Sequence, residues 1–206
     1  LHMSARRQRQ MCIRDSTKYM QSFLEKAEEL NALKFGDFTL KSGIKSKYFF
    51  DISKFFDNNS LSILSKHYVE LILENNLDFN CMFGPAYKGI PIAAAVGMEY
   101  FNKTGRQISL AFDRKEEKLH GEGGEFIGNL EGKQVLIIDD VLTAGTAIKG
   151  TVDYLEKNNA TLAAALVAFD REEKNEAGNL YKSLLTEEGI KIFSIAKFSD
   201  LSLKNV

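Results

Sequence analysis

Hydrophobic residues recur along this chain at two spacings, and each spacing predicts a different element. Residues 18–32 and the segment after Ser60 have apolar side chains at helical intervals, with Ser60 placed to act as an N-cap. Short apolar runs bounded by charged or turn-forming residues predict buried strands at 81–83, 108–112, 135–138, 161–169 and 190–198. Helical patterns at 90–102 and 146–157 fall between them. Strands that alternate with helices predict an α/β fold with a central, mostly parallel sheet flanked by helices.

The N-terminal part has its own pattern. Short strand patterns at 38–40 and 48–52 lie on either side of a turn-like Lys-Ser-Gly sequence and predict a hairpin-like hood. We expect about residues 17–55 to form this hood with C-terminal elements, within a single domain over 17–206. Residues 1–16 have four arginines against one aspartate and no apolar periodicity, so we expect a non-native or disordered extension there. A basic transit peptide is the alternative.

Composition narrows the function classes. The 206 residues are 44% hydrophobic, which is enough for a sizeable core. No apolar run approaches the ~18 residues of a membrane span, and a net charge of −1 offers no general attraction for nucleic acid or anionic lipid. Two cysteines, Cys12 and Cys81, indicate a reduced, cytoplasmic setting without a disulfide framework. We expect Cys81 in the core and His67 on a helix surface.

Two adjacent acids, Asp139 and Asp140, follow the strand pattern at 135–138 and precede a turn of small residues and a helix. A helix that begins just after a strand directs its first N–H groups and the positive end of its dipole at an anion, most often a phosphate. Two carboxylates beside such an anion require sugar hydroxyls or a divalent cation to be held there too. The arrangement predicts a site for a phosphorylated sugar. Nearby sequences that approach Walker or dinucleotide-binding loops lack required lysine or glycine positions.

Residues 135–146, which read VLIIDDVLTAGT, resemble the signature of the type I phosphoribosyltransferases. Four further segments narrow the resemblance to the orotate phosphoribosyltransferase family: FGDFTLKSG at 35–43, YFF at 48–50, FGPAYKGIP at 83–91 and DRKEEKLHGEGG at 113–124. The five segments occur in the order found in that family, and the resemblance spans roughly residues 18–200. It implies the type I phosphoribosyltransferase fold.

On this resemblance, Asp139 and Asp140 accept hydrogen bonds from the ribose 2′ and 3′ hydroxyls, although two acids can simply end a strand. The loop after them binds the 5-phosphate through backbone amides and hydroxyls, with Gly145 permitting close approach. The part of the phosphoribosyl diphosphate site implied in this segment comprises Asp139, Asp140, Val141, Leu142, Thr143, Ala144, Gly145, Thr146 and Ala147.

Four potentially cationic side chains, Arg114, Lys115, Lys118 and His120, precede a glycine-rich stretch. By composition alone this segment could be a solvated surface loop. The resemblance implies a mobile lid that binds the diphosphate and, in the family, closes over the active site of the neighbouring subunit. A homodimer is therefore expected. The catalytic residues implied are Lys115, Lys118, His120, Asp139 and Asp140.

The remaining implied contacts lie outside these two segments. Tyr87 and Lys88 are matched to the diphosphate, although a lysine after a strand is usually a surface residue. Lys41 is matched to both the diphosphate and the base, although it could be a turn lysine.

The implied orotate site comprises Lys41, Phe49, Phe50, Thr143 and Arg171. The family places the two phenylalanines over the planar orotate ring, but they alternate across a strand, so at least one should lie in the core. Arg171 resembles the arginine that meets the orotate carboxylate, and a structural salt bridge is its alternative role.

The implied reaction joins orotate to 5-phosphoribosyl 1-diphosphate and gives orotidine 5′-monophosphate and diphosphate. Mg²⁺ is the expected cofactor, held mainly by substrate oxygens and without a direct metal site on the protein.

Two alternative functions remain. One is a phosphoribosyltransferase of another base specificity, such as a purine, and the other is a non-catalytic regulator that senses the sugar diphosphate. The two phenylalanines and Arg171 favour orotate, and the lid sequence favours an enzyme.

Overall fold

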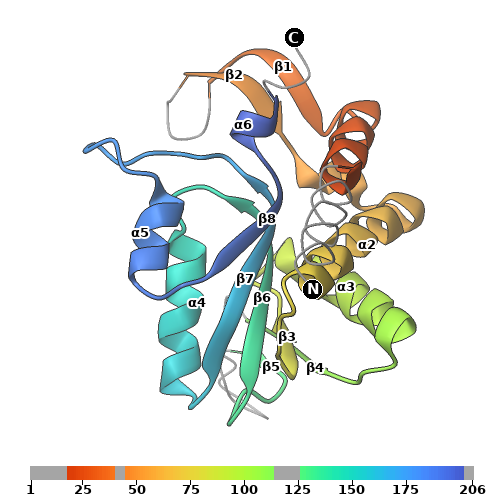
Figure 1. Ribbon diagram of the computed structural model, residues 1–206, viewed down its shortest axis with the longest axis vertical. Helices are drawn as coiled ribbons and strands as arrows, with labels where there is room; N and C mark the ends of the chain where they lie inside the picture. The colour runs from red at the N-terminus through yellow and green to blue at the C-terminus, as the bar shows by residue number, and fades with distance from the viewer. Residues whose placement is uncertain (1–17, 40–44, 114–125, 202–206) are drawn as a thin grey trace, which may run out of the picture.

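The computed structural model of the chain describes residues 18–39, 45–113 and 126–201. Its main feature is a six-stranded sheet with the order β5–β4–β3–β6–β7–β8 (Figure 1). Neighbouring strands are parallel except for the edge pair, in which β5 runs antiparallel to β4. The mostly parallel sheet is thereby confirmed. Its strands are β3 (Cys81–Phe83), β4 (Ser109–Asp113), β5 (Phe126–Ile127), β6 (Gln134–Leu142), β7 (Thr161–Asp170) and β8 (Ile192–Lys197).

Helices cover both faces of this sheet (Figure 1). One face carries α2 (Asn58–Glu74) and α3 (Gly89–Thr104), and the other carries α4 (Thr146–Lys157) and α5 (Tyr181–Glu187). Successive residues of β6 therefore enter different cores: Leu136 and Ile138 pack in the core beneath α2 and α3, and Val135 and Ile137 pack in the core beneath α4 and α5. Because β6 is covered on both faces, its residues from Val135 to Ile138 form a continuous apolar run.

The hood lies at one end of the large sheet (Figure 1). It contains a helix at 18–29, the antiparallel pair β1 (Leu33–Thr39) and β2 (Lys45–Phe50), and the short 3₁₀-helix η1 (Ile52–Phe55). The C-terminal turn α6 (Phe198–Leu201) follows β8 and lies beneath β2. Aromatic packing joins the hood to the sheet, with the Phe50 ring stacked on Phe169 of β7 at a centroid distance of 4.9 Å.

Several local expectations need correction. Asp57, not Ser60, caps α2, because its carboxylate accepts from the N–H groups of Asn59 and Ser60 at 3.0 and 2.9 Å. His67 is buried, not on the surface, and its ring packs edge-on against Phe23 at 5.9 Å. Cys81 is buried as expected. The sequence patterns did not predict the short α5 or β5.

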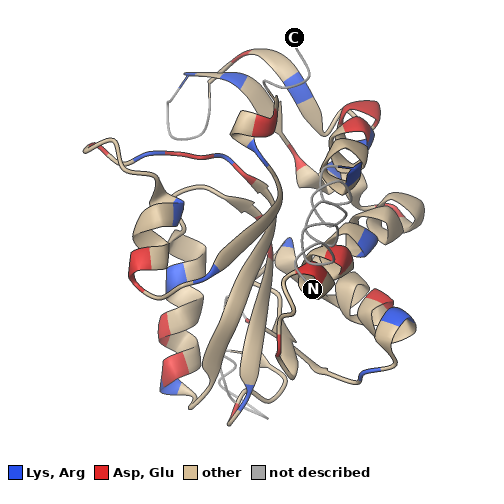
Figure 2. Ribbon diagram, viewed as in Figure 1, with Lys and Arg blue, Asp and Glu red and all other residues tan. Residues whose placement is uncertain are grey.

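Charged residues follow the same layering (Figure 2). Lysine, arginine, aspartate and glutamate are interspersed along the helices and loops, whereas the middle of the large sheet is almost free of them. None of the helices in the described ranges combines the length and the hydrophobicity of a membrane span.

Candidate active site

The predicted site residues gather where three parallel strands end. Phe83 of β3 pairs with Ile137 of β6, and Leu142 of β6 pairs with Asp170 of β7, so the segments after these strands leave from one edge of the sheet. Such an edge is where ligands bind in open α/β sheets. The strand β6 is longer than expected, because pairing with β7 continues through Asp139 and Asp140 as far as Leu142.

The two acids of β6 lie in different environments. Asp139 is buried, and its backbone carbonyl accepts a 2.6 Å hydrogen bond from the Tyr68 hydroxyl on α2. Asp140 is partly exposed, and its Oδ2 lies 3.0 Å from Nζ of Lys88. Burial, followed by repulsion from Asp140, raises the pKa of Asp139 to about 7. The carboxyl group of Asp139 is thus harder to ionise than an ordinary aspartate, and Asp140 lies beside a cation.

Hydrogen bonds to the backbone fix the directions of both carboxylates. Oδ1 of Asp139 accepts from the N–H of Asp140 at 2.8 Å, and Oδ1 of Asp140 accepts from the N–H of Val141 at 2.9 Å. Each carboxylate is thereby anchored through one oxygen. The pair is a preorganised acceptor for the neighbouring hydroxyls of a sugar.

The loop after β6 leads into the N-terminus of α4. Gly145 is the N-cap residue of this fully described helix and has a left-handed conformation (φ 75°). The first turn contains no acidic residue, and no side chain caps it with a hydrogen bond. Thr143 and Thr146 are exposed. A Cβ at position 145 would lie 2.4 Å from Cδ1 of Leu185 on α5, so both the conformation and the packing require glycine. The helix N-terminus is open to an anion, with two hydroxyls beside it.

The segment after β3 delivers Lys88 to this edge. A Cβ on Gly89 would lie 2.8 Å from the carbonyl oxygen of Ile138, so glycine lets the start of α3 pack directly on the β6 backbone. The N–H of Ala86 donates to Asp113 at the end of β4, and the Ala86–Tyr87 peptide bond is cis. Tyr87 is 67% exposed, whereas Lys88 pairs with Asp140. The turn therefore holds a cation over the acidic pair.

Arg171 follows β7 and lies beside the hood. Its backbone N–H donates to the Leu142 carbonyl at 3.1 Å, which connects Arg171 to the start of the loop between β6 and α4. Nη1 lies 3.6 Å from Oε1 of Glu173, and Nε is buried without a hydrogen-bond partner among the described residues. Burial raises the pKa of Tyr48 on β2 to about 12, and the nearby Arg171 charge opposes that rise. The guanidinium thus lies close to the hood strand.

The two phenylalanines of β2 have different surroundings. Phe50 is 4% exposed and stacks on Phe169, as expected if at least one of the pair lies in the core. Phe49 is 38% exposed, and its ring packs against Phe38 of β1 with the centroids 5.7 Å apart. The side chain of Phe49, and not that of Phe50, can contact a planar ligand.

Five of the predicted site residues lie outside the described residues: Lys41, Arg114, Lys115, Lys118 and His120. Within the described part, the structure brings Lys88, Asp139 and Asp140 together beside the loop at 143–147 and places Arg171 close to Tyr48 of the hood. Tyr68, Asp113 and Glu173 also support the site, although no sequence pattern marks them. Tyr68 is 71 positions from the carbonyl that it binds, and no sequence spacing signals that contact.

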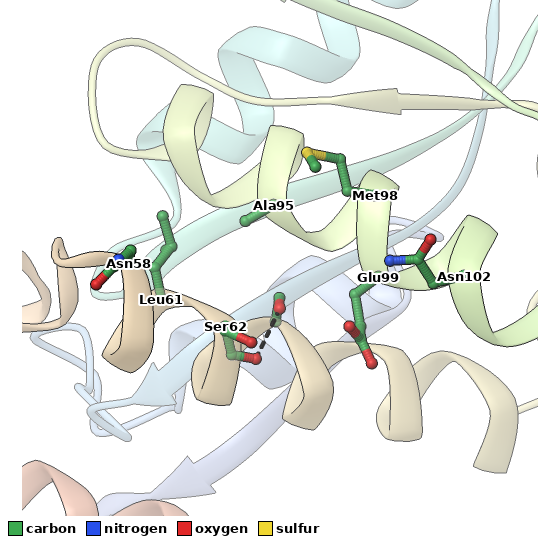
Figure 3. Close-up of a pocket in the computed structure, with 8 residues that line it drawn as sticks. Asn58, Leu61, Ser62, Ala95, Met98, Glu99 and Asn102 are labelled. Carbon is green, nitrogen blue, oxygen red and sulfur yellow. Dashed lines mark hydrogen bonds between the residues drawn. The ribbon is translucent and has the colours of Figure 1, made fainter.

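A separate cavity of about 230 Å³ lies between the outer faces of α2 and α3 (Figure 3). Met98 and Ala95 line it from α3, together with Leu61 and polar residues of α2. Its lining contains none of the predicted site residues. This cavity is therefore distinct from the strand-end site.

Comparison with known proteins identifies the family. The phosphoribosyl transferase domain family matches residues 51–202. An orotate phosphoribosyltransferase of Schizosaccharomyces pombe is 47% identical over 157 residues, 76% of this chain and 73% of its own. One from an Enterobacter species is 39% identical over 89% of this chain and 86% of its own. The crystal structure of the Francisella tularensis orotate phosphoribosyltransferase superposes with a TM-score of 0.77 at 36% identity, covering 87% of each chain. The chain belongs to the orotate phosphoribosyltransferase family of pentosyltransferase enzymes.

Proposed function

We propose that this protein transfers the 5-phosphoribosyl group from 5-phosphoribosyl 1-diphosphate to orotate, as a step in the synthesis of UMP. The observation that carries the proposal is the acidic pair of β6 followed directly by the uncapped N-terminus of α4. A sugar with hydroxyls at one end and a phosphate at the other matches this arrangement. In the reaction, the bond from ribose C1 to diphosphate breaks, a bond from C1 to the orotate ring nitrogen forms, and diphosphate and a proton are released.

The phosphoribosyl end is held by the β6–α4 segment. The ribose 2′ and 3′ hydroxyls donate to Asp139 and Asp140, and the 5-phosphate accepts from the backbone and hydroxyl groups of residues 143–147. Positive charge develops on the ribose ring as diphosphate leaves, and the carboxylate of Asp140 is placed to stabilise it. These contacts hold the donor so that C1 faces the base, which lowers the entropic part of the barrier.

The base end is held by Arg171 and the hood. The guanidinium of Arg171 pairs with the carboxylate of orotate, and its unpartnered Nε supplies a donor for that contact. The exposed ring of Phe49 covers the planar base. A cation at this position favours a base that carries a carboxylate over adenine, hypoxanthine or uracil.

The diphosphate end requires several cations. Lys88 is the described one, and we propose that Tyr87, Lys41, Arg114, Lys115, Lys118 and His120 complete this end.

Mg²⁺ fits the site, because the available donors are two adjacent carboxylates, and this ion typically combines one or two carboxylates with substrate phosphates and water. Asp139 and Asp140 would lie nearest to it, with most of its ligands from substrate. When bound, Mg²⁺ neutralises negative charge on the diphosphate oxygens.

We further propose a cytoplasmic homodimer in which the lid residues of one subunit complete the site of the other. Exposed apolar side chains on α3, Met98 and Phe101, support an interface between subunits. Mixing two inactive variants tests the shared site. A Lys118→Ala subunit combined with an Asp139→Ala/Asp140→Ala subunit should regain activity, since one site then contains both native groups. A lid that acts within its own subunit would leave the mixture inactive.

Substrate specificity is tested by turnover. Protein, Mg²⁺ and 5-phosphoribosyl 1-diphosphate are mixed with orotate, adenine, hypoxanthine or uracil, and ultraviolet absorbance is followed. We expect consumption of orotate alone. Turnover of a purine would indicate another base specificity, and calorimetric binding of the sugar diphosphate without turnover of any base would indicate a regulator.

A further inference from the structure

Glu172 has an unusual backbone conformation for its residue type. Four non-glycine residues of the described chain have positive φ, and the other three are asparagines: Asn31, Asn76 and Asn159. Asparagine tolerates the left-handed region, whereas glutamate is strained there. Glu172, at φ 51°, directly follows Arg171. The surrounding contacts must therefore hold Glu172 in this conformation.

The Glu172 carboxylate connects the turn after β7 to the turn after β8. Oε2 accepts from the backbone N–H of Ser199 at 2.6 Å, and Oε1 accepts from the Ser199 hydroxyl at 3.2 Å. Nζ of Lys197 lies 4.0 Å from Oε1. The backbone N–H of Glu172 donates to Oδ1 of the buried Asp170 at 2.9 Å. Both the main chain and the side chain of Glu172 are thus fixed.

Through Ser199, this connection reaches the hood. The residue before Ser199 is Phe198, whose ring stacks on Tyr48 of β2 with a centroid distance of 5.1 Å and an interplanar angle of 24°. Tyr48 is also the neighbour of Phe49 in the strand. Figure 1 shows α6 between β2 and the end of β8. One side chain therefore links the residue after Arg171 to the strand that carries the exposed aromatic ring.

We propose that Glu172 is a positioning residue for the base end of the site, an inference that rests on the function proposed above. It holds Arg171 and the β2 strand at a fixed separation, so that the guanidinium and the hood meet the same planar carboxylate-bearing base. The phosphoribosyl end depends on β6 and α4, and within the described residues Glu172 forms no hydrogen bond or ion pair with either element. Loss of the Glu172 carboxylate should weaken orotate binding and leave binding of the sugar diphosphate intact.

Steady-state kinetics of four variants test this. Glu172→Ala should raise KM for orotate about tenfold, while KM for 5-phosphoribosyl 1-diphosphate stays within about twofold of the parent. Glu172→Gln retains an oxygen that accepts from the Ser199 N–H and should restore most of the orotate affinity. Glu172→Gly adopts the backbone conformation freely but lacks the carboxylate, so it should resemble Glu172→Ala. Glu176→Ala removes an exposed acid from the same loop between β7 and α5 and should behave like the parent.

The outcomes separate the two proposals. A parent enzyme that does not use orotate removes the proposed function and this inference together. A parent that uses orotate, with equal changes in both KM values or none in the alanine variant, overturns only the inference. Normal orotate affinity in Glu172→Gly would overturn it too, because the effect would then belong to backbone strain. If Glu172→Ala does not fold, Glu172→Gly decides the question.

Discussion

The proposed phosphoribosyl end of the site comes from one continuous segment, β6 through the first turn of α4. The proposed base end is assembled from β2, the turn after β7, and α6. At the first end, adjacent residues bond to one another, as in the 2.8 Å contact between Asp140 and Asp139. At the second, Glu172 reaches Ser199 across 27 positions. The directions of the two carboxylates are thus fixed by local backbone geometry, whereas the base end depends on how the hood packs on the sheet.

This contrast predicts that variants at the phosphoribosyl end abolish the reaction, whereas variants at the base end alter affinity or folding. We expect the largest effect from Asp139→Ala/Asp140→Ala. Removing both acceptors of the ribose hydroxyls should lower kcat/KM by about 1,000-fold or more. Turnover assays measure this, and calorimetry with the sugar diphosphate and Mg²⁺ should show weakened binding.

The control for the double variant is Asp153→Ala, an exposed acid on α4 that leaves the strand end unchanged. Its activity should equal that of the parent. Parent-like activity in the double variant would contradict the role given to the acidic pair.

Within the base end, the two phenylalanines of β2 should separate affinity from stability. Phe50→Ala removes a ring buried against Phe23 and Phe169 and should lower the free energy of unfolding by about 3–5 kcal/mol. Phe49→Ala removes an exposed ring and should change stability by about 1 kcal/mol or less, but raise KM for orotate about tenfold. Denaturant unfolding and kinetics of both variants measure the split. Equal stability losses would show that both rings serve the core.

At the phosphoribosyl end, Gly145→Ala tests the close approach of the loop to α5. The substitution places a Cβ against Leu185 at a left-handed position, so it should cost about 2–3 kcal/mol of stability and weaken binding of the sugar diphosphate. Gly178→Ala is a matched control: its φ is 84° and no atom lies within 4 Å of the added Cβ. It should cost only about 1 kcal/mol and leave kinetics unchanged. Thermal unfolding and titration calorimetry compare the two variants. Equal stability losses, with parent-like binding in Gly145→Ala, would show that the contact with Leu185 does not require glycine at position 145.

The same contrast explains what sequence reasoning could predict. The buried run of β6, the two acids and the helix start at Thr146 are adjacent in the chain. The spacing of apolar residues, the charges and the turn-forming residues therefore identified them directly. The base end could be proposed only through resemblance, because no local pattern distinguishes a ligand-facing Phe49 from the core Phe50. The burial of His67 was mispredicted for a related reason, since the N-terminal helix that covers it is far away in sequence.

The smallest effect predicted here is a pH dependence of stability that arises from Asp139. Burial raises the pKa of this carboxyl from 3.8 to about 7, so between these values the folded state binds more protons than the unfolded state. Asp139 therefore contributes stability below about pH 4, and this contribution is lost as the pH rises to about 7. The parent should therefore lose stability across this range relative to Asp139→Asn, whose side chain does not ionise. Denaturant unfolding of both proteins at several pH values measures the difference. If the difference in unfolding free energy between the two proteins does not vary with pH, both acids ionise as ordinary carboxyl groups in the free protein. Lys88 and solvent then suffice to stabilise both charges.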